Sequence, residues 1–579
     1  MKVSDYIVNY FVEKNICDFF GYQGTMIAHF VDSIGKNDKA KNHVCYNEQG
    51  ASFAACGYSS STGKCAVAYA TSGPGALNLV SGIANAYYDS IPVVFITGQI
   101  NTYERYEDNE DLRQDAFQET KTVDICRPIT KYAVEIRDPN QIPAALEKAY
   151  ELATTGRKGP VLLDLPMNIQ RAEIEVPALT QKEQQTNSQP INAIDVLEQA
   201  LASSARPVLM LGNGIDRKHR ASFVRFAEGL NLPIVTSLMG KDILPHDHSL
   251  NFGYIGGAYG NRYANLIVTA KADQIIAIGC SLCTRQTGTK VQEFAPNAKV
   301  LRFDIDPNEL KRKIKPDEIG ILIDSSDLAQ TLDDNQNRWK DWPKVSNQWL
   351  DFCSRYKNFC ESFDDSVTYS LPNHVIEAIN PHIDENDIVA CDVGQHMMWI
   401  GQSLQSKKEL TIMFSGAHGA MGYALPAAIG AGVAHPNKTV YCFCGDGAFQ
   451  MNIQELQWLK NEDLNVVVFV FNNNSLGLIT QQQDSLFDGN YHGAASPDFS
   501  SPNFTEVAKA YGIDAVRIDQ IEQIDSVLQQ RKKGHPLLVE FVFNEPTKAY
   551  PKTNFGNPIY NQEPAIPQDI LDRFMNEEV

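Results

Sequence analysis

Residues 441–477 read YCFCGDGAFQMNIQELQWLKNEDLNVVVFVFNNNSLG, and the predicted fold follows from this segment. Two apolar runs of strand length enclose a segment of helical length. Polar turns follow both runs, Gly445-Asp446-Gly447 after the first and Asn472-Asn473-Asn474 after the second. A strand, a helix and a second strand in this order predict a crossover unit with two parallel strands. Because ligands collect at the carboxyl ends of parallel strands, we expect both turns to face one site.

The chemistry of the two turns favours a phosphate and a metal ion. Glycine lets the backbone approach a charged group closely, and a helix that starts after Gly447 has free N–H groups for an anion. Asp446 offers a hard oxygen of the kind that Mg²⁺ shares with phosphate oxygens. A GDG tripeptide alone is more often an ordinary turn. Its spacing from the asparagines, with a helix and a strand between them, is what makes the pattern specific.

The same alternation extends over the whole chain. Strand-like runs followed by helical or glycine-rich segments recur in three successive parts, for example at 66–70, 207–211 and 439–444. We therefore predict an α/β protein with three consecutive open parallel-sheet domains. The predicted parts are a first domain at 1–172, a polar linker at 173–190, a middle domain at 191–345, a third domain at 366–545 and an extended tail with a short terminal helix at 546–579.

The composition is that of a soluble globular protein, with 43% apolar and 21% charged residues. A net charge of -20 argues against nucleic acid or an anionic membrane as a partner. The start MKVSDYIVNYFVEKN has no signal or transit pattern, and no long apolar run predicts a membrane span, so we expect a cytoplasmic protein. The 12 cysteines are scattered, and the C-x-x-C pair Cys280 and Cys283 lacks a second pair to complete a zinc site.

The segments GDGAFQMNIQEL and FVFNNNSLGLITQQQ closely resemble the cofactor motif of the thiamine diphosphate-dependent acetolactate synthase family, large catalytic subunit type. The resemblance covers nearly the whole chain. It implies a pyrimidine-binding first domain, a flavodoxin-like or DHS-like, FAD-binding type of middle domain, and a diphosphate- and metal-binding third domain. It also implies that Asp446 and Asn473 bind Mg²⁺ or a similar divalent metal by their side chains, and that Ser475 binds it by its carbonyl.

The resemblance further implies which residues contact thiamine diphosphate. Met421, in SGAHGAMGYALPAAIGA, is implied as an apolar wedge that bends the cofactor, although a methionine is more often plain core. The Gly419 carbonyl is implied as the acceptor of the cofactor's amine, and Gln395 and His396 as donors to phosphate. The complete implied set is Val393, Gly394, Gln395, His396, Gly419, Met421, Gly445, Gly447 and Ala448.

Glu48 falls where the family keeps a buried glutamate opposite the aminopyrimidine ring. The resemblance implies that it stabilises the ring tautomer that deprotonates the thiazolium carbon. Burial favours the protonated form of a carboxyl group, so a glutamate in a dry site can hold the required proton. An isolated glutamate is normally a solvated surface charge, but the neighbours in NEQGASFAACGY are small and apolar. Because Glu48 and Asp446 fall in different domains, the resemblance implies a homodimer or homotetramer with sites between subunits.

The reaction implied is decarboxylation of a 2-keto acid, with pyruvate as the expected donor, and transfer of the acyl carbanion to a second carbonyl compound. Simple decarboxylases similar to this group carry paired histidines where this chain has Phe117-Gln118. That difference favours carboligation over release of an aldehyde, and Gln118 is the candidate to polarise a bound carbonyl. Gly24 and Thr25, in the glycine turn FGYQGTMIAHF, complete the catalytic candidates.

The sequence does not identify the acceptor substrate. Arg285 falls where the family keeps an arginine for the acceptor's carboxylate, a group that guanidinium binds well, although an ordinary ion pair is the alternative. Gln482 replaces the family's tryptophan, and the tail resembles relatives that act in cell-surface sugar or secondary metabolism. A 2-keto acid, an aldehyde and a nucleotide-linked keto-sugar are therefore all candidate acceptors.

Two other functions are weighed against this one. Flavin-dependent oxidation of pyruvate would use FAD as a redox group, whereas FAD in a carboligase would be structural, because that reaction has no redox step. A non-catalytic assembly subunit would be expected to lose Glu48 or Asp446, and both are present.

Overall fold

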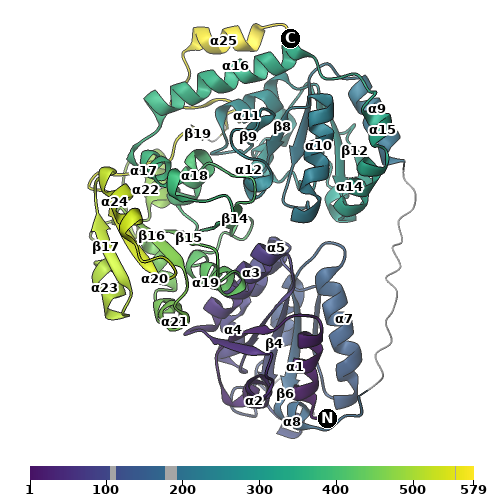
Figure 1. The fold of residues 1–579 in the computed structure, drawn as a ribbon, viewed down its shortest axis with the longest axis vertical. Helices are drawn as coiled ribbons and strands as arrows, with labels where there is room; N and C mark the ends of the chain where they lie inside the picture. Colours follow the sequence, from purple (N-terminus) through teal and green to yellow (C-terminus); the bar gives the residue numbers. More distant parts are fainter. Residues whose placement is uncertain (105–111, 177–191, 555) are drawn as a thin grey trace.

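The computed structural model of the chain describes residues 1–104, 112–176, 192–554 and 556–579. Most of the predicted linker therefore lies outside the described residues. Three six-stranded sheets follow one another along the chain, and every strand pair within them is parallel (Figure 1). The prediction of an α/β protein with three open parallel sheets is confirmed.

The first sheet is built from strands that are fully buried at its centre and flanked by helices. Its order is β2-β1-β3-β4-β6-β5, which places the first three strands of the chain side by side. The strands are β1 (Asp18–Gly21), β2 (Lys41–Val44), β3 (Ala66–Ala70), β4 (Val93–Gln99), β5 (Tyr132–Glu135) and β6 (Val161–Pro166).

The middle and third sheets repeat this open arrangement. Their orders are β12-β11-β10-β7-β8-β9 and β14-β13-β15-β16-β18-β17. In the middle sheet the strands are β7 (Pro207–Leu211), β8 (Ile234–Thr236), β9 (Asn251–Tyr254), β10 (Gln274–Ile278), β11 (Lys299–Asp304) and β12 (Ile319–Leu322). In the third they are β13 (Ile388–Cys391), β14 (Thr411–Phe414), β15 (Val440–Gly445), β16 (Val466–Asn472), β17 (Asp514–Ile518) and β18 (Leu537–Val542).

Two helices join the first and third domains, α3 (Glu48–Thr62) and α19 (Ala424–Ala434) (Figure 1). Both are rich in small residues, and α19 is apolar on all sides, as expected of a helix enclosed by protein. Their backbones approach so closely that a Cβ atom at Gly57 would lie 2.1 Å from the Ala427 carbonyl oxygen, and one at Gly430 2.0 Å from that of Ala54. One hydrophobic core therefore runs through both domains.

The C-terminal segment is built into the middle domain. Helix α16 (Asn347–Phe363) occupies the interval between the two predicted domain boundaries, and helix α25 (Gln568–Asn576) packs on it through Phe574. A short antiparallel pair, β19 (Lys552–Thr553) and β20 (Gln562–Glu563), precedes α25. The expected terminal helix is present, and the tail is anchored rather than merely extended. None of the helices among the described residues has the length and apolar character needed to span a membrane.

Gly430→Ala tests the close contact of α3 and α19. The added methyl group would overlap the backbone of α3, so we expect a loss of about 1–3 kcal/mol in stability, seen as a lower thermal unfolding midpoint. Gly35→Ala is the matched control, because a Cβ at Gly35 meets nothing within 4 Å. An equal midpoint for both variants would contradict the packing described.

Candidate cofactor and metal site

Three loops of the third domain meet at one edge of its sheet. They follow β13, β15 and β16, which are neighbours in the sheet, and they contain residues 392–396, 445–448 and 472–477. The structure therefore brings the third-domain candidates from these loops together at the carboxyl ends of parallel strands, the place where such sheets bind ligands.

Asp446 is a nearly fully buried carboxylate at this edge, with 2% of its surface exposed. It accepts hydrogen bonds from Gly447 N at 2.8 Å, Ser475 N at 3.1 Å and the Ser501 hydroxyl at 2.7 Å. Burial raises the pKa of Asp446 to about 6, against the lowering effect of these donors. A cation bound nearby would stabilise the charged form of this buried carboxyl group and so lower its pKa.

Asn473 and Asp446 both accept a hydrogen bond from the Ser475 backbone N–H. Asn473 Oδ1 accepts from Ser475 N at 3.2 Å, and Asn473 Nδ2 donates to the Thr547 hydroxyl at 2.6 Å. Thr547 also donates to Gln395 Oε1 at 2.7 Å, so the candidates of two loops share one partner. Carboxylate, amide and carbonyl oxygens are the ligands that Mg²⁺ prefers, and this donor set fits such an ion. No sequence pattern indicated Thr547, which follows β18 in the chain.

His396 has a buried ring nitrogen, Nε2, that makes no hydrogen bond to the described residues. The side chain is buried, and burial lowers its pKa to about 3, so the imidazole is neutral at physiological pH. Cβ atoms at Gly394 and Gly445 would lie 2.5 Å and 3.0 Å from the ring, so glycine is needed on both sides. A bound phosphate fits this position, because its negative charge would favour the protonated imidazolium, in which Nε2 is a donor, and buried polar groups are normally satisfied.

Two buried aspartates hold the loop that carries Gly419 and Met421. The Asp392 carboxylate accepts from Gly422 N at 2.9 Å and Ala424 N at 2.8 Å, and burial raises its pKa to about 6. Asp89, from the first domain, accepts from Ala417 N at 2.8 Å, and burial raises its pKa to about 7. Sequence reasoning missed both, although each follows an apolar segment. Gly419 has a φ of +71° and open space where a Cβ would lie.

The first-domain candidates gather at the corresponding edge of their own sheet. Glu48 begins α3, is 8% exposed, and accepts from Asn78 Nδ2 at 2.9 Å. A Cβ at Gly75 would lie 2.8 Å from its carboxylate, so the glycine makes room for it. Gly24 packs equally closely on Thr71, and Thr25 starts the short helix that follows. The glutamate is therefore buried in a crevice of small residues rather than solvated.

Phe117 and Gln118 follow a segment that lies outside the described residues, 105–111. Gln118 has a φ of +66°, a backbone conformation uncommon for residues other than glycine, and it packs on Gly73. The Phe117 side chain is 79% exposed.

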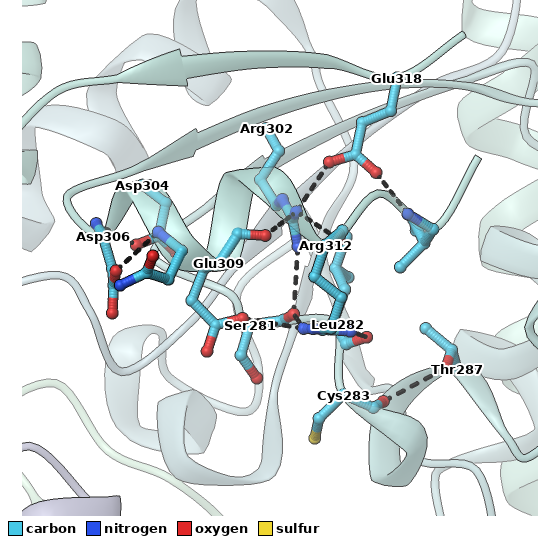
Figure 2. A network of polar contacts seen from close by, with 12 residues as sticks. Ser281, Leu282, Cys283, Thr287, Arg302, Asp304, Asp306, Glu309, Arg312 and Glu318 are labelled. Carbon is cyan, nitrogen blue, oxygen red and sulfur yellow. Dashed lines mark hydrogen bonds and ion pairs between the residues drawn. The ribbon is translucent and has the colours of Figure 1, made fainter. Parts of the chain in front are cut away.

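A cavity of about 1570 Å³ is lined by residues of all three domains, and both Arg285 and Gln482 line it. Arg285 Nη1 donates to the Gly416 carbonyl at 3.3 Å. The loop that leads to Arg285 is tied down by Arg302, which is fully buried, pairs with Glu318 at 2.8 Å and donates to the Ser281 carbonyl at 3.2 Å (Figure 2).

The two cysteines of the C-x-x-C pair lie in this loop. Cys280 is buried and Cys283 is half-buried on the cavity wall, and both are free thiols.

Family models match all three domains. They are the N-terminal TPP binding domain, the central domain and the C-terminal TPP binding domain of thiamine pyrophosphate enzymes, at residues 1–125, 194–332 and 392–541. The chain is 34% identical to the probable acetolactate synthase large subunit of Methanocaldococcus jannaschii, over 99% of this chain and 98% of the relative. It is also 34% identical to the acetolactate synthase large subunits of Corynebacterium glutamicum, over 95% and 88%, and Lactococcus lactis subsp. lactis, over 96% and 94%.

Asp446→Asn tests the buried carboxylate as a metal ligand. As a metal ligand Asp446 would act in its charged form, and its pKa of about 6 means that the charge is lost as the pH falls through that value. We expect Mg²⁺ affinity of the unmodified protein, measured by calorimetry in the presence of thiamine diphosphate, to fall steeply below pH 6. The asparagine variant should bind Mg²⁺ weakly at every pH. Wild-type affinity in that variant would rule out the role.

Proposed function

The chain belongs to the thiamine pyrophosphate enzyme family, and on this premise we propose that it is a carboligase of the acetolactate synthase type. It decarboxylates a 2-keto acid, with pyruvate as the proposed donor, and transfers the acyl unit to a second carbonyl compound. One observation carries the proposal. Two buried carboxyl groups, Asp446 as the candidate metal ligand and Glu48, each lie at the ligand-binding edge of their own parallel sheet.

The residues described fit the cofactor and its metal. Asp446, Asn473 and the Ser475 carbonyl would hold Mg²⁺, and His396 Nε2, which lacks a protein partner, would donate to the diphosphate. The remaining contacts are proposed for Val393, Gly394, Gln395, Gly419, Met421, Gly445, Gly447 and Ala448. When bound, thiamine diphosphate supplies the acidic carbon that adds to a keto group and the electron sink that permits loss of carbon dioxide.

Glu48 has surroundings suited to direct contact with a ring nitrogen of the cofactor. Its carboxylate is out of bulk water and has one neutral donor, Asn78, at 2.9 Å. Phe117 and Gln118, in place of paired histidines, provide no imidazole proton donor at these two positions, which disfavours the protonation that would release an aldehyde. Gln118 can donate to the oxygen of a bound carbonyl, and the strained backbone that presents it is a frequent feature of functional sites.

We propose that each site forms between two copies of the chain, in a homodimer or a homotetramer. Within one chain, the Glu48 carboxylate contacts a first-domain residue and the Asp446 carboxylate contacts third-domain residues. Large apolar side chains are exposed on the segments beside both groups, and a second copy would cover them. They are Tyr22, Leu77 and Phe117 in the first domain, and Met451, Ile479 and Leu486 in the third.

The large cavity supports two further proposals. Arg285 and Gln482 would bind the acceptor, with the guanidinium facing its carboxylate. The middle-domain part of the cavity is lined by glycine-rich turns, by Asp304 at the end of β11 and by Asp324 after β12, and it would accommodate FAD in a structural role. Mass spectrometry of small molecules released from the purified protein tests FAD, and product analysis with pyruvate alone tests whether a second 2-keto acid suffices as acceptor. If neither acetolactate nor acetoin forms, an aldehyde or nucleotide-linked keto-sugar must be supplied.

Glu48→Gln tests the central role proposed for the glutamate. The amide cannot hold a transferable proton, so turnover of pyruvate should fall by about 10²–10⁴-fold while thiamine diphosphate stays bound. Steady-state kinetics and calorimetric cofactor binding measure the two effects separately. Near-normal turnover would remove the mechanism.

Gln482→Trp tests the acceptor pocket. An indole ring on the cavity wall would reduce the space for a large acceptor, so the preference between acceptors of different size should shift, by roughly tenfold for one added or lost apolar contact. Competition between two 2-keto acids, followed by product analysis, measures the shift. An unchanged product ratio would show that position 482 does not face the acceptor.

A further inference from the structure

Glu455 is a buried carboxylate that lies directly behind the turn carrying Glu48. It begins α21 (Glu455–Glu462) in the third domain, and its side chain has no exposed surface. Its two oxygens accept from the backbone N–H of Tyr46 at 3.0 Å and 3.2 Å, and one also accepts from Gln454 Nε2 at 3.2 Å. The Asn47 N–H is a further donor to it. None of the cofactor or metal contacts proposed above involves this residue.

The first domain is shaped to receive this carboxylate. A Cβ atom at Gly50 would lie 2.5 Å from Glu455 Oε1, so the carboxylate takes the space that any other residue at position 50 would fill. A second contact from the same third-domain segment reaches the turn, where Asn452 Nδ2 donates to Gln49 Oε1 at 3.1 Å. The turn from Tyr46 to Gly50 is thus held from the third domain on both sides of Glu48.

The two glutamates also interact through their charges. Burial raises the pKa of Glu455 to about 7, and the negative charge of Glu48 raises it too, whereas the Tyr46 and Asn47 N–H groups lower it. Backbone N–H groups aimed at a carboxylate favour its charged form and restrict its position. A change at Glu455 would therefore alter both the placement and the electrostatic surroundings of Glu48.

We propose that Glu455 is a positioning residue for Glu48, acting from the third domain by fixing the Tyr46–Asn47 backbone from which the catalytic glutamate projects. The proposal rests on the function proposed above for Glu48. It assigns Glu455 no contact with substrate, because its bonds run to the backbone of the turn.

Glu455→Gln keeps the size of the side chain but removes the charge that the two N–H groups face. In the apoprotein, amide hydrogen exchange of the peptide 43–52 should become about tenfold faster. In the holoprotein at saturating cofactor, exchange of the thiazolium C2 proton with deuterium, followed by acid quench and NMR, should become about tenfold slower. Glu506→Gln is the control in the same domain, because the exposed Glu506 pairs with Lys509 and has no contact with the peptide 43–52.

Gly50→Ala gives a second route to the same displacement without altering Glu455 itself. The new methyl group would push the carboxylate from the turn, so C2 exchange should slow as in Glu455→Gln. Alanine normally stabilises a helix relative to glycine. Slower exchange of the C2 proton in Gly50→Ala would therefore not result from a less stable α3. Gly35→Ala, in open space, is its control.

The results separate the two proposals. Slower C2 exchange in both Glu455→Gln and Gly50→Ala, with faster amide exchange at 43–52 and unchanged controls, supports the positioning role. If Glu48→Gln loses C2 exchange while Glu455→Gln exchanges at the wild-type rate, Glu455 is only structural and the inference fails. If Glu48→Gln itself exchanges normally, the proposed function fails, and the inference fails with it.

Discussion

A carboxylate that is removed from water must be met by donors, and this requirement organises the candidate site. Asp446, Asp392, Asp89 and Glu455 are all buried, and each accepts backbone N–H groups from a loop other than its own segment. The loops that would contact the cofactor are therefore fixed by charged side chains rather than by apolar packing alone. Two of these carboxylates cross between the first and third domains, so the domains and the site are ordered together.

The close contact of α3 and α19 provides the apolar counterpart. Small residues along both helices let the two backbones meet, and the shared core places the start of α3, where Glu48 lies, at the junction of the domains. Glu48 and Asp446 nevertheless face partners within their own domains in one chain. In the assembly proposed above, a second copy would complete the site and would also cover the exposed apolar side chains beside both groups.

Local patterns carried most of what the sequence could predict. Strand, turn and helix alternate over short distances, so the three parallel sheets, and the turns at Asp446 and Asn473, were predictable without knowledge of the tertiary structure. Thr547, Asp392 and Glu455 were not, because their importance lies in partners up to several hundred residues away. The anchoring of the tail on the middle domain was missed for the same reason. The role of Phe574 depends on its contact with Tyr356 in α16, about two hundred residues earlier in the chain.

The account depends most on the claim that two chains share each site, and mixing two inactive variants tests it directly. A homodimer of Glu48→Gln chains has no intact Glu48 in either site, and a homodimer of Asp446→Ala chains has no intact Asp446, so both are expected to be inactive. If the chains exchange at random after unfolding and refolding together in equal amounts, half of the dimers are mixed, and each mixed dimer has one intact site. The account predicts recovery of about a quarter of wild-type carboligation, whereas no recovery from demonstrably mixed dimers would show that Glu48 and Asp446 serve the same chain and would contradict it.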